Sequence, residues 1–324
     1  MNKLTIAVLT FNRANYLVKM LDSILKQTYK DFNVIIYDNC SSDNTSQIVQ
    51  PFLNDKRFSY HRHNAPVYNI NYALNNCKTE YLTIAHDDDI MNPDMIKEQI
   101  SILELHDDVS MVCTNINYID TNGNITRSSI IRHASVNNSY IVKGREYINV
   151  LLKKNNFVIC PTVMFRMKVI KENNLQFRQE IGGTADLFFW FELNQLNYNF
   201  YFINKNLYNY RIHEGQDSKN TLFLLPLLRR PVFELLANHN YSNFTKNSWL
   251  CWIDKRIIVE INKHLNKKEA FESIKNKFLF NNSKDFFLII GIFYIIYTPS
   301  FLKALFYLPI KILKKIKKAL SSND

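Results

Sequence analysis

Three consecutive carboxylates, Asp87, Asp88 and Asp89, follow a short apolar run over residues 81–85 in a chain that is otherwise basic. The apolar run predicts a buried strand, so the triplet stands where that strand ends. Carboxylates packed this closely repel one another unless a cation relieves the repulsion. Crowded oxygen ligands of this kind suit Mg²⁺ or Mn²⁺ holding a phosphate. A solvated acidic turn is the alternative interpretation of the same residues.

Alternating strand and helix patterns precede and follow the triplet and must position it. Apolar strands are predicted over residues 4–10, 33–37, 58–61, 81–85 and 111–117, and helices over 14–26, from a cap at Ser42 or Asp43 to about 53, 69–76 and 95–105. This alternation predicts an α/β fold with a mainly parallel sheet covered by helices on both faces. Ligands bind such sheets beyond the carboxyl ends of strands. Because Asp38 also follows a strand, two acidic strand ends are expected to meet at one crevice.

Weaker patterns follow residue 117. The stretch over 118–142 is polar and rich in Asn, Ser and Thr, which indicates a loop or hairpin excursion. Helix and strand patterns resume at Gly144, another strand is predicted over 200–203, and the chain becomes helical beyond about Pro226. We find no internal repeat.

Composition limits the class of protein. The 324 residues are 47% hydrophobic and 14% aromatic, which argues for a folded chain with one large core or two modest ones. The formal net charge of +11 suits nucleic acid, anionic lipid or phosphorylated ligands. Much of the excess lies at the C-terminus, and no zinc-finger or RNA-binding signature occurs, so we expect no nucleic-acid partner.

Glycine and cysteine usage excludes other classes. None of the six glycines forms a GxGxxG turn or a P-loop, and no GxSxG motif occurs, so a dinucleotide dehydrogenase, a P-loop kinase or a serine hydrolase is not expected. The five cysteines are scattered, without metal-ligand spacing, and suit reduced thiols in the cytosol. The N-terminus opens directly into a strand-like segment with no secretory signal, so we expect a cytoplasmic protein.

Several motifs together resemble the family 2 inverting glycosyltransferases. They are TIAVLTFNR at 5–13, DNCSSDNT at 38–45, and the triplet followed by Asn92 and Pro93. The resemblance covers about residues 3–218. It implies the GT-A fold, with a Rossmann-like, mainly parallel sheet flanked by helices and a helical C-terminal extension. It further implies a catalytic domain over 1–225, whose nucleotide-binding half is 1–117 and whose acceptor half is 118–225.

The resemblance also implies a reaction. Such an enzyme moves a sugar from a nucleotide-sugar, with UDP favoured, to a glycan or lipid-linked acceptor in bacterial surface-polysaccharide biosynthesis. A single displacement inverts the configuration of the sugar, and Mn²⁺ or Mg²⁺ neutralises the departing diphosphate.

Matching positions carry roles on the donor side. Asp38 matches the aspartate that accepts a hydrogen bond from the uracil ring, and a carboxylate can accept from an imide N–H. Turn chemistry is the alternative for Asp38. Thr10, Asn12 and Arg13 resemble the loop that wraps the base and diphosphate. Asp43 is expected to cap the helix that follows.

The triplet resembles the DxD-like motif of the family. Counting back from Pro93, Asp88 matches the metal ligand and Asp87 the neighbour near the ribose, while Asp89 is expected to support the loop. His86 stands where many relatives carry an aspartate, and a structural role is the favoured interpretation for it.

The general base is expected further along the chain. Asp186 matches the catalytic aspartate, although Ala185 replaces the usual Glu before it. A partly buried Asp beside aromatic residues would have a raised pKa and deprotonate the acceptor hydroxyl more effectively. Helix N-capping is an alternative that does not exclude this role.

A later segment, Tyr208 to Gly215, resembles the YRxH-type motif of the family. Arg211 is expected to meet a phosphate, and His213 to ligate the metal or contact the leaving diphosphate, with a structural histidine as the alternative. The segment 160–166 resembles one that lines the acceptor side. Glycines common in relatives are missing around 64–71 and at Thr79, which leaves local loop shape open.

The C-terminus changes composition. Residues 286–297 are almost wholly apolar, but a helix of about 12 residues spans only about 18 Å, short of the roughly 30 Å of a bilayer core. Further on, apolar and lysine residues take opposite helical faces, which indicates an interfacial helix on anionic lipid. We therefore expect a helical extension over 226–282 and a membrane-associating segment over 283–324, on the inner face of the cell membrane. A helical hairpin dipping into the membrane and a dimer-forming helix pair are the alternatives.

Two other functions fit parts of the sequence less well. A nucleotidyltransferase would need a Gly-rich, basic loop after the first strand, and Thr10 to Arg13 do not form one. A non-catalytic nucleotide- or glycan-binding scaffold at the membrane is favoured only by the missing Glu at Ala185.

Overall fold

A computed structural model describes residues 2–63, 69–128, 139–154, 156–216, 221–263 and 269 of the chain. The chain divides into two compact units, one formed by residues 1–219 and 231–246 and the other by 220–230 and 247–324. The domain boundaries expected at 117, 225 and 282 stay predictions.

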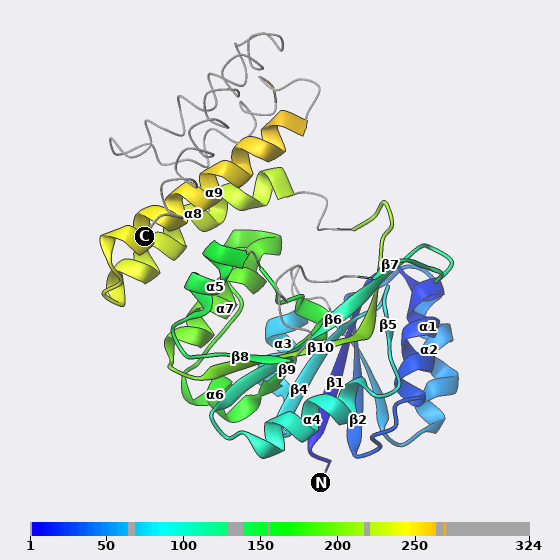
Figure 1. The fold of residues 1–324 in the computed structure, drawn as a ribbon. Coiled ribbons are helices and arrows are strands. Elements are labelled where there is room, and N and C mark those ends of the chain that lie inside the picture. The colour runs from blue at the N-terminus through cyan, green and yellow to red at the C-terminus, as the bar shows by residue number, and fades with distance from the viewer. Residues whose placement is uncertain are drawn as a thin grey trace. The chain divides into compact units, whose positions relative to one another are not determined.

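The first unit is built on one sheet (Figure 1). Among the described residues its strands are β1 (Leu4–Thr10), β2 (Phe32–Asp38), β3 (Phe58–Arg62), β4 (Tyr81–His86), β5 (Ile90–Met91), β6 (Val109–Ile119), β7 (Ile125–Ser128), β8 (Tyr140–Val142), β9 (Met164–Arg166) and β10 (Asn199–Arg211). The order is β3-β2-β1-β4-β9-β6-β10-β5, with β7 beside β6 and β8 beside β10.

The long strands of this sheet run in one direction. β3, β2, β1 and β4 pair in parallel, as do β6 and β10. The short β9 pairs antiparallel with both β4 and β6, so it joins the two parallel halves without reversing either. The expectation of an α/β fold with a mainly parallel sheet is confirmed.

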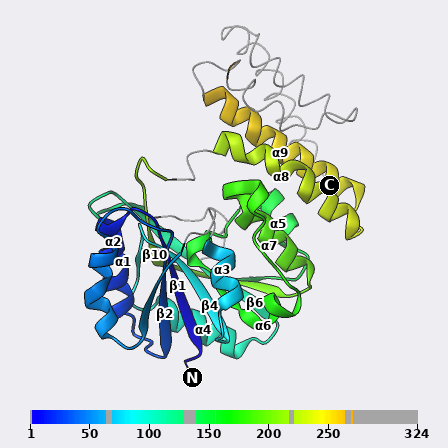
Figure 2. The same cartoon turned by 180° about the vertical axis from the view of Figure 1, so that it is seen from behind.

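Helices cover both faces of the sheet, as expected. The described helices are α1 (Ala14–Leu25), α2 (Thr45–Val49), α3 (Asn69–Asn76), α4 (Met95–Leu105), α5 (Tyr147–Lys154), α6 (Met167–Glu172), α7 (Ala185–Gln195), α8 (Thr221–Asn238) and α9 (Asn243–Lys263). α4 lies in front of the sheet in Figure 1 and α3 in Figure 2. One core cluster holds apolar side chains of α1, α2 and α4 against the strands, including Leu21, Val49 and Ile100.

Two elements differ from the prediction for identifiable reasons. The helix expected to reach residue 53 is α-helical only to Val49 and continues as a 3₁₀ turn over Gln50–Asn54. Pro51 has no N–H to donate to the preceding turn, which favours this change. β10 is 13 residues long instead of four, because its polar half pairs with β6 through two register shifts.

The second unit contains the first part of α8 and most of α9. Trp249 Nε1 donates to the carbonyl of Arg229 at 3.1 Å, and Arg229 Nε lies 2.8 Å from Asp254 Oδ1. The Trp249 and Trp252 rings stack at 5.4 Å. No helix within the described ranges has both the length and the apolar content needed to cross a membrane. The segment 283–324 lies outside the described residues.

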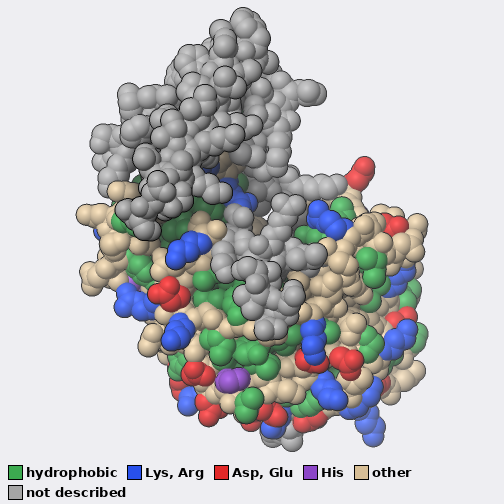
Figure 3. All heavy atoms as spheres, viewed as in Figure 1, with side chains coloured by type: hydrophobic (Ala, Val, Ile, Leu, Met, Phe, Trp, Pro, Cys, Tyr) green, Lys and Arg blue, Asp and Glu red, His purple; other side chains and the backbone are tan. Residues whose placement is uncertain are grey.

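On the face drawn in Figure 3, the described basic and acidic side chains are intermixed with apolar ones. This face therefore carries no single basic field among the residues that the structure describes.

Candidate active site

The carboxyl ends of neighbouring strands bring the predicted donor-side residues together. Thr10, the last residue of β1, is the register partner of Asp38, the last residue of β2. Leu9 is likewise the partner of His86 at the end of β4, directly before the acidic triplet. The expectation that the two acidic strand ends lie at one edge of the sheet is confirmed.

Asp38 is fully buried and engaged on both oxygens. Its Oδ1 accepts from the backbone N–H of Ser41 at 2.9 Å and from the Ser41 hydroxyl at 2.5 Å. Its Oδ2 accepts from the Tyr60 hydroxyl at 2.5 Å. Burial and this bond to Asp38 raise the pKa of Tyr60. The bonds from Ser41 show that Asp38 stabilises the turn that follows β2. Its contact with a nucleobase stays a prediction.

The loops after β1 and β2 are locked together by side chains. The Asn12 N–H donates to Ser41 Oγ at 2.9 Å, and Asn12 Oδ1 accepts from the Ser42 N–H at 2.7 Å. Asn12 has a φ of 52°, a left-handed conformation that asparagine tolerates better than most residues. Asp43 accepts from the N–H groups of Ala14 and Thr45, each at 3.1 Å, at the starts of α1 and α2. The N-cap of α2 is Asn44 and not Ser42 or Asp43 as expected, but Asp43, one residue earlier, binds the first N–H group of each helix.

Arg13 is the cation that faces two members of the triplet. Its Nη1 lies 3.2 Å from Asp87 Oδ1 and 3.1 Å from Asp88 Oδ2, and its Nη2 donates to the Gly215 carbonyl at 3.0 Å. Burial and the charge of Asp88 raise the pKa of Asp87 to about 7, against the opposing effects of Arg13 and the Thr10 hydroxyl. The predicted donor loop and the predicted acidic motif are thus in direct contact.

Asp88 is the member of the triplet held in its charged form. His213 Nε2 lies 2.8 Å from Asp88 Oδ2, the oxygen that Arg13 also contacts. Burial alone would raise the pKa of Asp88. The nearby charge of His86, the His213 bond and Arg13 together lower it. The structure therefore unites Asp88 and His213, the two expected metal ligands, although they are 125 positions apart in the sequence.

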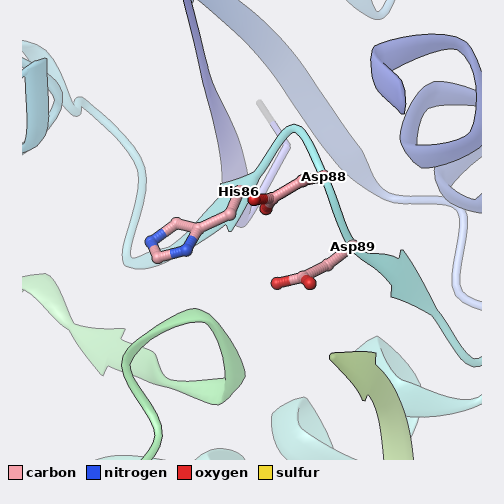
Figure 4. A group of neighbouring side chains, drawn as sticks. All are labelled: His86, Asp88 and Asp89. Atoms are coloured by element: carbon pink, nitrogen blue, oxygen red, sulfur yellow. The ribbon is translucent and has the colours of Figure 1, made fainter. Parts of the chain in front are cut away.

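A further set of possible ligand atoms includes residues that were not expected to hold a metal. Ligand atoms of His86, Asp88 and Asp89 all lie within 4.8 Å of one another (Figure 4). Asp89 Oδ1 accepts from the Arg211 N–H at 2.7 Å, while its Oδ2 is buried without a hydrogen-bond partner among the described residues. Burial and Asp88 raise the pKa of Asp89 well above its ordinary value.

This donor set fits a divalent cation. Carboxylate oxygens with an imidazole nitrogen suit Mn²⁺ better than Mg²⁺, which prefers oxygen ligands alone. The unpartnered Asp89 Oδ2 and the like charges beside it are relieved by such an ion. His86 and Asp89 therefore join Asp88 and His213 as candidate ligands. In the sequence, the position of His86 two residues before Asp88, where many relatives carry an aspartate, was the feature that could have indicated His86 as a ligand.

Arg211 is buried among backbone carbonyls. Its Nε donates to Asp88 O at 2.5 Å, and its Nη1 donates to Asp120 O at 2.6 Å and Thr121 O at 3.0 Å. Its guanidinium lies 4.8 Å from the centre of the Tyr16 ring. Arg211 thus ties the triplet to the β6–β7 turn. The phosphate contact expected for it stays a prediction, and Nη2 is left without a partner among the described residues.

Asp186 lies in the first turn of α7 and, among the described residues, forms no hydrogen bond with the triplet or its partners. A 3₁₀ turn over Gln179–Thr184, in which Gly182 has a left-handed φ of 56°, leads into α7. Burial raises the pKa of Asp186 to about 6, although the Leu187 N–H at 2.6 Å partly stabilises its charge. Burial and, to a smaller extent, the charge of Asp186 raise the pKa of the Cys160 thiol, in the segment expected on the acceptor side. The expected raised pKa is present, and the role of base stays a prediction.

Comparisons with known proteins agree with this geometry. Residues 5–173 match the family described as Glycosyl transferase family 2. The chain is 25% identical over 218 residues to an uncharacterized glycosyltransferase of Methanocaldococcus jannaschii, covering 64% of this chain and 70% of that protein. It is 27% identical over 237 residues to the O-antigen biosynthesis glycosyltransferase WbnJ of Escherichia coli, covering 69% and 85%.

A third relative is the poly(ribitol-phosphate) beta-N-acetylglucosaminyltransferase TarS of Staphylococcus aureus, 24% identical over 196 residues. The match covers 58% of this chain but only 32% of TarS, so the chain spans about a third of that enzyme. The crystal structure of TarS 1-349 in complex with UDP-GlcNAc superposes with a TM-score of 0.62 at 19% identity, covering 94% of this chain and 83% of that one.

The fold is shared with these structures, and the family match extends over more than half of the 324 residues. The chain therefore belongs to glycosyl transferase family 2 and has the GT-A fold.

Proposed function

We propose that the chain is a metal-dependent inverting glycosyltransferase that uses a UDP-sugar, and that its acceptor is a glycan or lipid-linked glycan of a cell-surface polysaccharide. The observation that carries the proposal is the ionised Asp88, which contacts Arg13 and His213 beside Asp38 at the strand ends. TarS structures with UDP and with UDP-GlcNAc, and the O-antigen enzyme WbnJ, support this donor and this pathway class.

Each residue of the site has a place in the proposed reaction. Asp38 accepts from the base, and the loop of Thr10, Asn12 and Arg13 surrounds the nucleotide, while Asp87 lies on the ribose side. His86, Asp88, Asp89 and His213 would hold Mn²⁺ or Mg²⁺, and a mannosyltransferase of Pyrobaculum calidifontis with the same fold was solved with GDP-Man and Mn²⁺. When bound, such an ion neutralises charge on the diphosphate leaving group.

Asp186 supplies the base in this proposal. Its carboxylate takes the proton from the acceptor hydroxyl as that oxygen bonds to the anomeric carbon and the bond to the diphosphate breaks. A carboxylate whose pKa is about 6 is a stronger base than an ordinary aspartate and is still ionised at neutral pH. Attack from the face opposite the leaving group inverts the sugar configuration.

The decisive test removes the central carboxylate. In Asp88→Ala, we expect release of UDP from UDP-GlcNAc in the presence of Mn²⁺ to fall at least about 100-fold, because Arg13 and His213 lose their shared partner and the ion loses a ligand. Turnover would be followed with MnCl₂, with MgCl₂ and with EDTA, and folding by circular dichroism.

Asp107, an exposed aspartate outside the site, provides the matched control as Asp107→Ala. Asp88→Ala with wild-type turnover would reject the metal assignment. A wild-type chain that binds UDP but turns over neither UDP-GlcNAc nor other UDP-sugars would instead favour the non-catalytic scaffold.

A further inference from the structure

A row of asparagine side chains crosses the sheet from β6 to β10. Asn115 Nδ2 donates to Asn204 Oδ1 at 3.2 Å, and Asn117 Nδ2 donates to Asn209 Oδ1 at 3.0 Å. Asn206 Nδ2 donates to Asn117 Oδ1 at 2.9 Å. We call these five residues the amide ladder. Ser128 of β7 extends the ladder, because its hydroxyl donates to Asn117 Oδ1 at 3.0 Å.

The ladder lies on the sheet face that α7 covers. Strand alternation places Asn115 and Asn117 on the same face as Met111. Met111 is the register partner of Phe165, and the Phe165 ring contacts Phe189 and Trp190 of α7 at 5.7 and 5.8 Å. The large core cluster against α1 and α4 lies on the opposite face and includes Val112, Ile116 and Tyr208.

The ladder connects the two halves of the proposed reaction centre. At one end, the N–H of Thr114, the residue before Asn115, donates to Thr162 Oγ1 at 3.5 Å. On the same face, α7 packs against Phe165 through Phe189 and Trp190, and its first turn contains Asp186. At the other end, Asn209 stands two residues before Arg211, which binds Asp88 and Asp89. The ladder therefore shares its face of the sheet with the helix that carries the candidate base, and it ends two residues before Arg211 at the candidate metal site.

The ladder keeps hydrogen-bonding capacity that the described part of the chain does not use. Among the described residues, the Nδ2 groups of Asn204 and Asn209 and Oδ1 of Asn206 have no partner, although these side chains are half-buried. Each amide offers both donors and acceptors, as sugar hydroxyls do. Carboxylates and phosphates are instead typically bound by Arg or Lys, and no described cationic side chain hydrogen-bonds to the ladder.

We propose that the amide ladder binds the acceptor, and that the bound part of the acceptor is a neutral sugar or alditol, recognised through its hydroxyl groups. This inference rests on the proposed function. The existing bonds among the amides hold them in place before the acceptor arrives, so little side-chain freedom is lost on binding.

The test separates the acceptor from the donor. UDP release from UDP-GlcNAc with Mn²⁺ would be measured with water alone, and with GlcNAc, galactose, ribitol, glucuronic acid or glycerol phosphate added. We expect a neutral compound to stimulate release. In Asn206→Ala, the apparent KM for that compound should rise about fivefold, the loss of about one hydrogen bond. Acceptor-free hydrolysis and UDP affinity should stay unchanged.

Two variants control for structural damage. Asn33→Ala removes a matched amide–amide bond, between Asn2 and Asn33 at 2.8 Å, at the amino end of the strands and should leave every parameter unchanged. Ser128→Ala removes an exposed hydroxyl from the ladder and should raise the same acceptor KM without lowering the melting temperature.

The outcomes are distinguishable. If Asn206→Ala lowers acceptor-free hydrolysis and stimulated release by the same factor, the ladder is structural and the inference is wrong. If only glucuronic acid or glycerol phosphate stimulates the wild type, or none of the compounds does, the inference is wrong while the proposed function stands. A wild type that releases no UDP from any nucleotide-sugar rejects the proposed function and this inference with it.

Discussion

Among single residues, the three aspartates of the triplet differ because their partners differ. Asp88 has Arg13 and His213 within 3.1 Å and keeps a lowered pKa. Burial and the charge of Asp88 raise the pKa of Asp87 and of Asp89, and for Asp87 the Arg13 contact at 3.2 Å does not offset this. If the proposed divalent cation binds here, it should release protons from Asp87 and Asp89, because metal ligands bind in their deprotonated form.

The proposed role of Asp186 as base can be tested by replacing its carboxylate with an amide. Asp186→Asn should bind UDP normally and lose acceptor-dependent transfer, because an amide cannot take the proton. In the wild type, transfer should rise with pH through about 6, since the base must be deprotonated and its pKa is about 6. The pH–rate profiles of the wild type and of Asp186→Asn, from pH 4.5 to 8 at saturating Mn²⁺, would measure the pH dependence and the loss of transfer. Unchanged transfer in Asp186→Asn would reject Asp186 as base.

The same substitution has a consequence for stability. The folded pKa of about 6 exceeds the ordinary 3.8, so the folded state holds this proton more tightly than the unfolded state. The wild type therefore loses stability as pH rises from about 4 through 6, by at most about 3 kcal/mol. Asp186→Asn should remove this loss and melt at a higher temperature than wild type at pH 8.

At the scale of elements, β10 links the parts of the site. It pairs with β6, β5 and β8, and it carries amide-ladder residues along its length and Arg211 at its end. Two register shifts accompany the polar half of the strand. Sequence patterns located only its apolar start, because its later residues follow no simple alternation.

A prediction at this scale distinguishes structure from phosphate binding at Arg211. In Arg211→Lys, a single ammonium cannot serve Asp88, Asp120 and Thr121 at once, so we expect a loss of about 2–3 kcal/mol in the free energy of unfolding. UDP affinity of the folded fraction should change little. Urea denaturation and UDP titration would measure the two quantities.

Arg57→Lys is the control for that experiment, because Arg57 pairs at 2.6 Å with Asp55 near the surface and should lose less than about 1 kcal/mol. The opposite result, in which Arg211→Lys keeps full stability and loses UDP binding, would support the phosphate contact.

For the whole molecule, the open prediction concerns the C-terminus. We propose that residues 283–324 hold the protein on the cytoplasmic face of the membrane through an apolar and a lysine-rich helical face. Deletion from Ser283 onward should move the protein from the membrane fraction to the soluble fraction. High-salt washing should release part of the full chain, because the lysine contribution is screened. A truncated chain that stays in the membrane fraction would contradict this proposal.

The sequence alone determined the order of the longer strands and helices up to about residue 117, the parallel sheet and the acidic strand ends, because apolar periodicity and turn residues are local properties. It did not locate the short strands β5, β7, β8 and β9, whose two to four residues are too few for a periodic pattern. It also determined the family, through motifs that are each contiguous. Only the tertiary structure decided which residues meet at the site. His213 and Arg13 contact the same oxygen of Asp88, and ligand atoms of His86 and Asp89 lie close to Asp88. Arg211 donates to backbone carbonyls. The tertiary structure also decided the amide ladder, because strands distant in sequence bring its residues together and no local pattern records which distant strands pair.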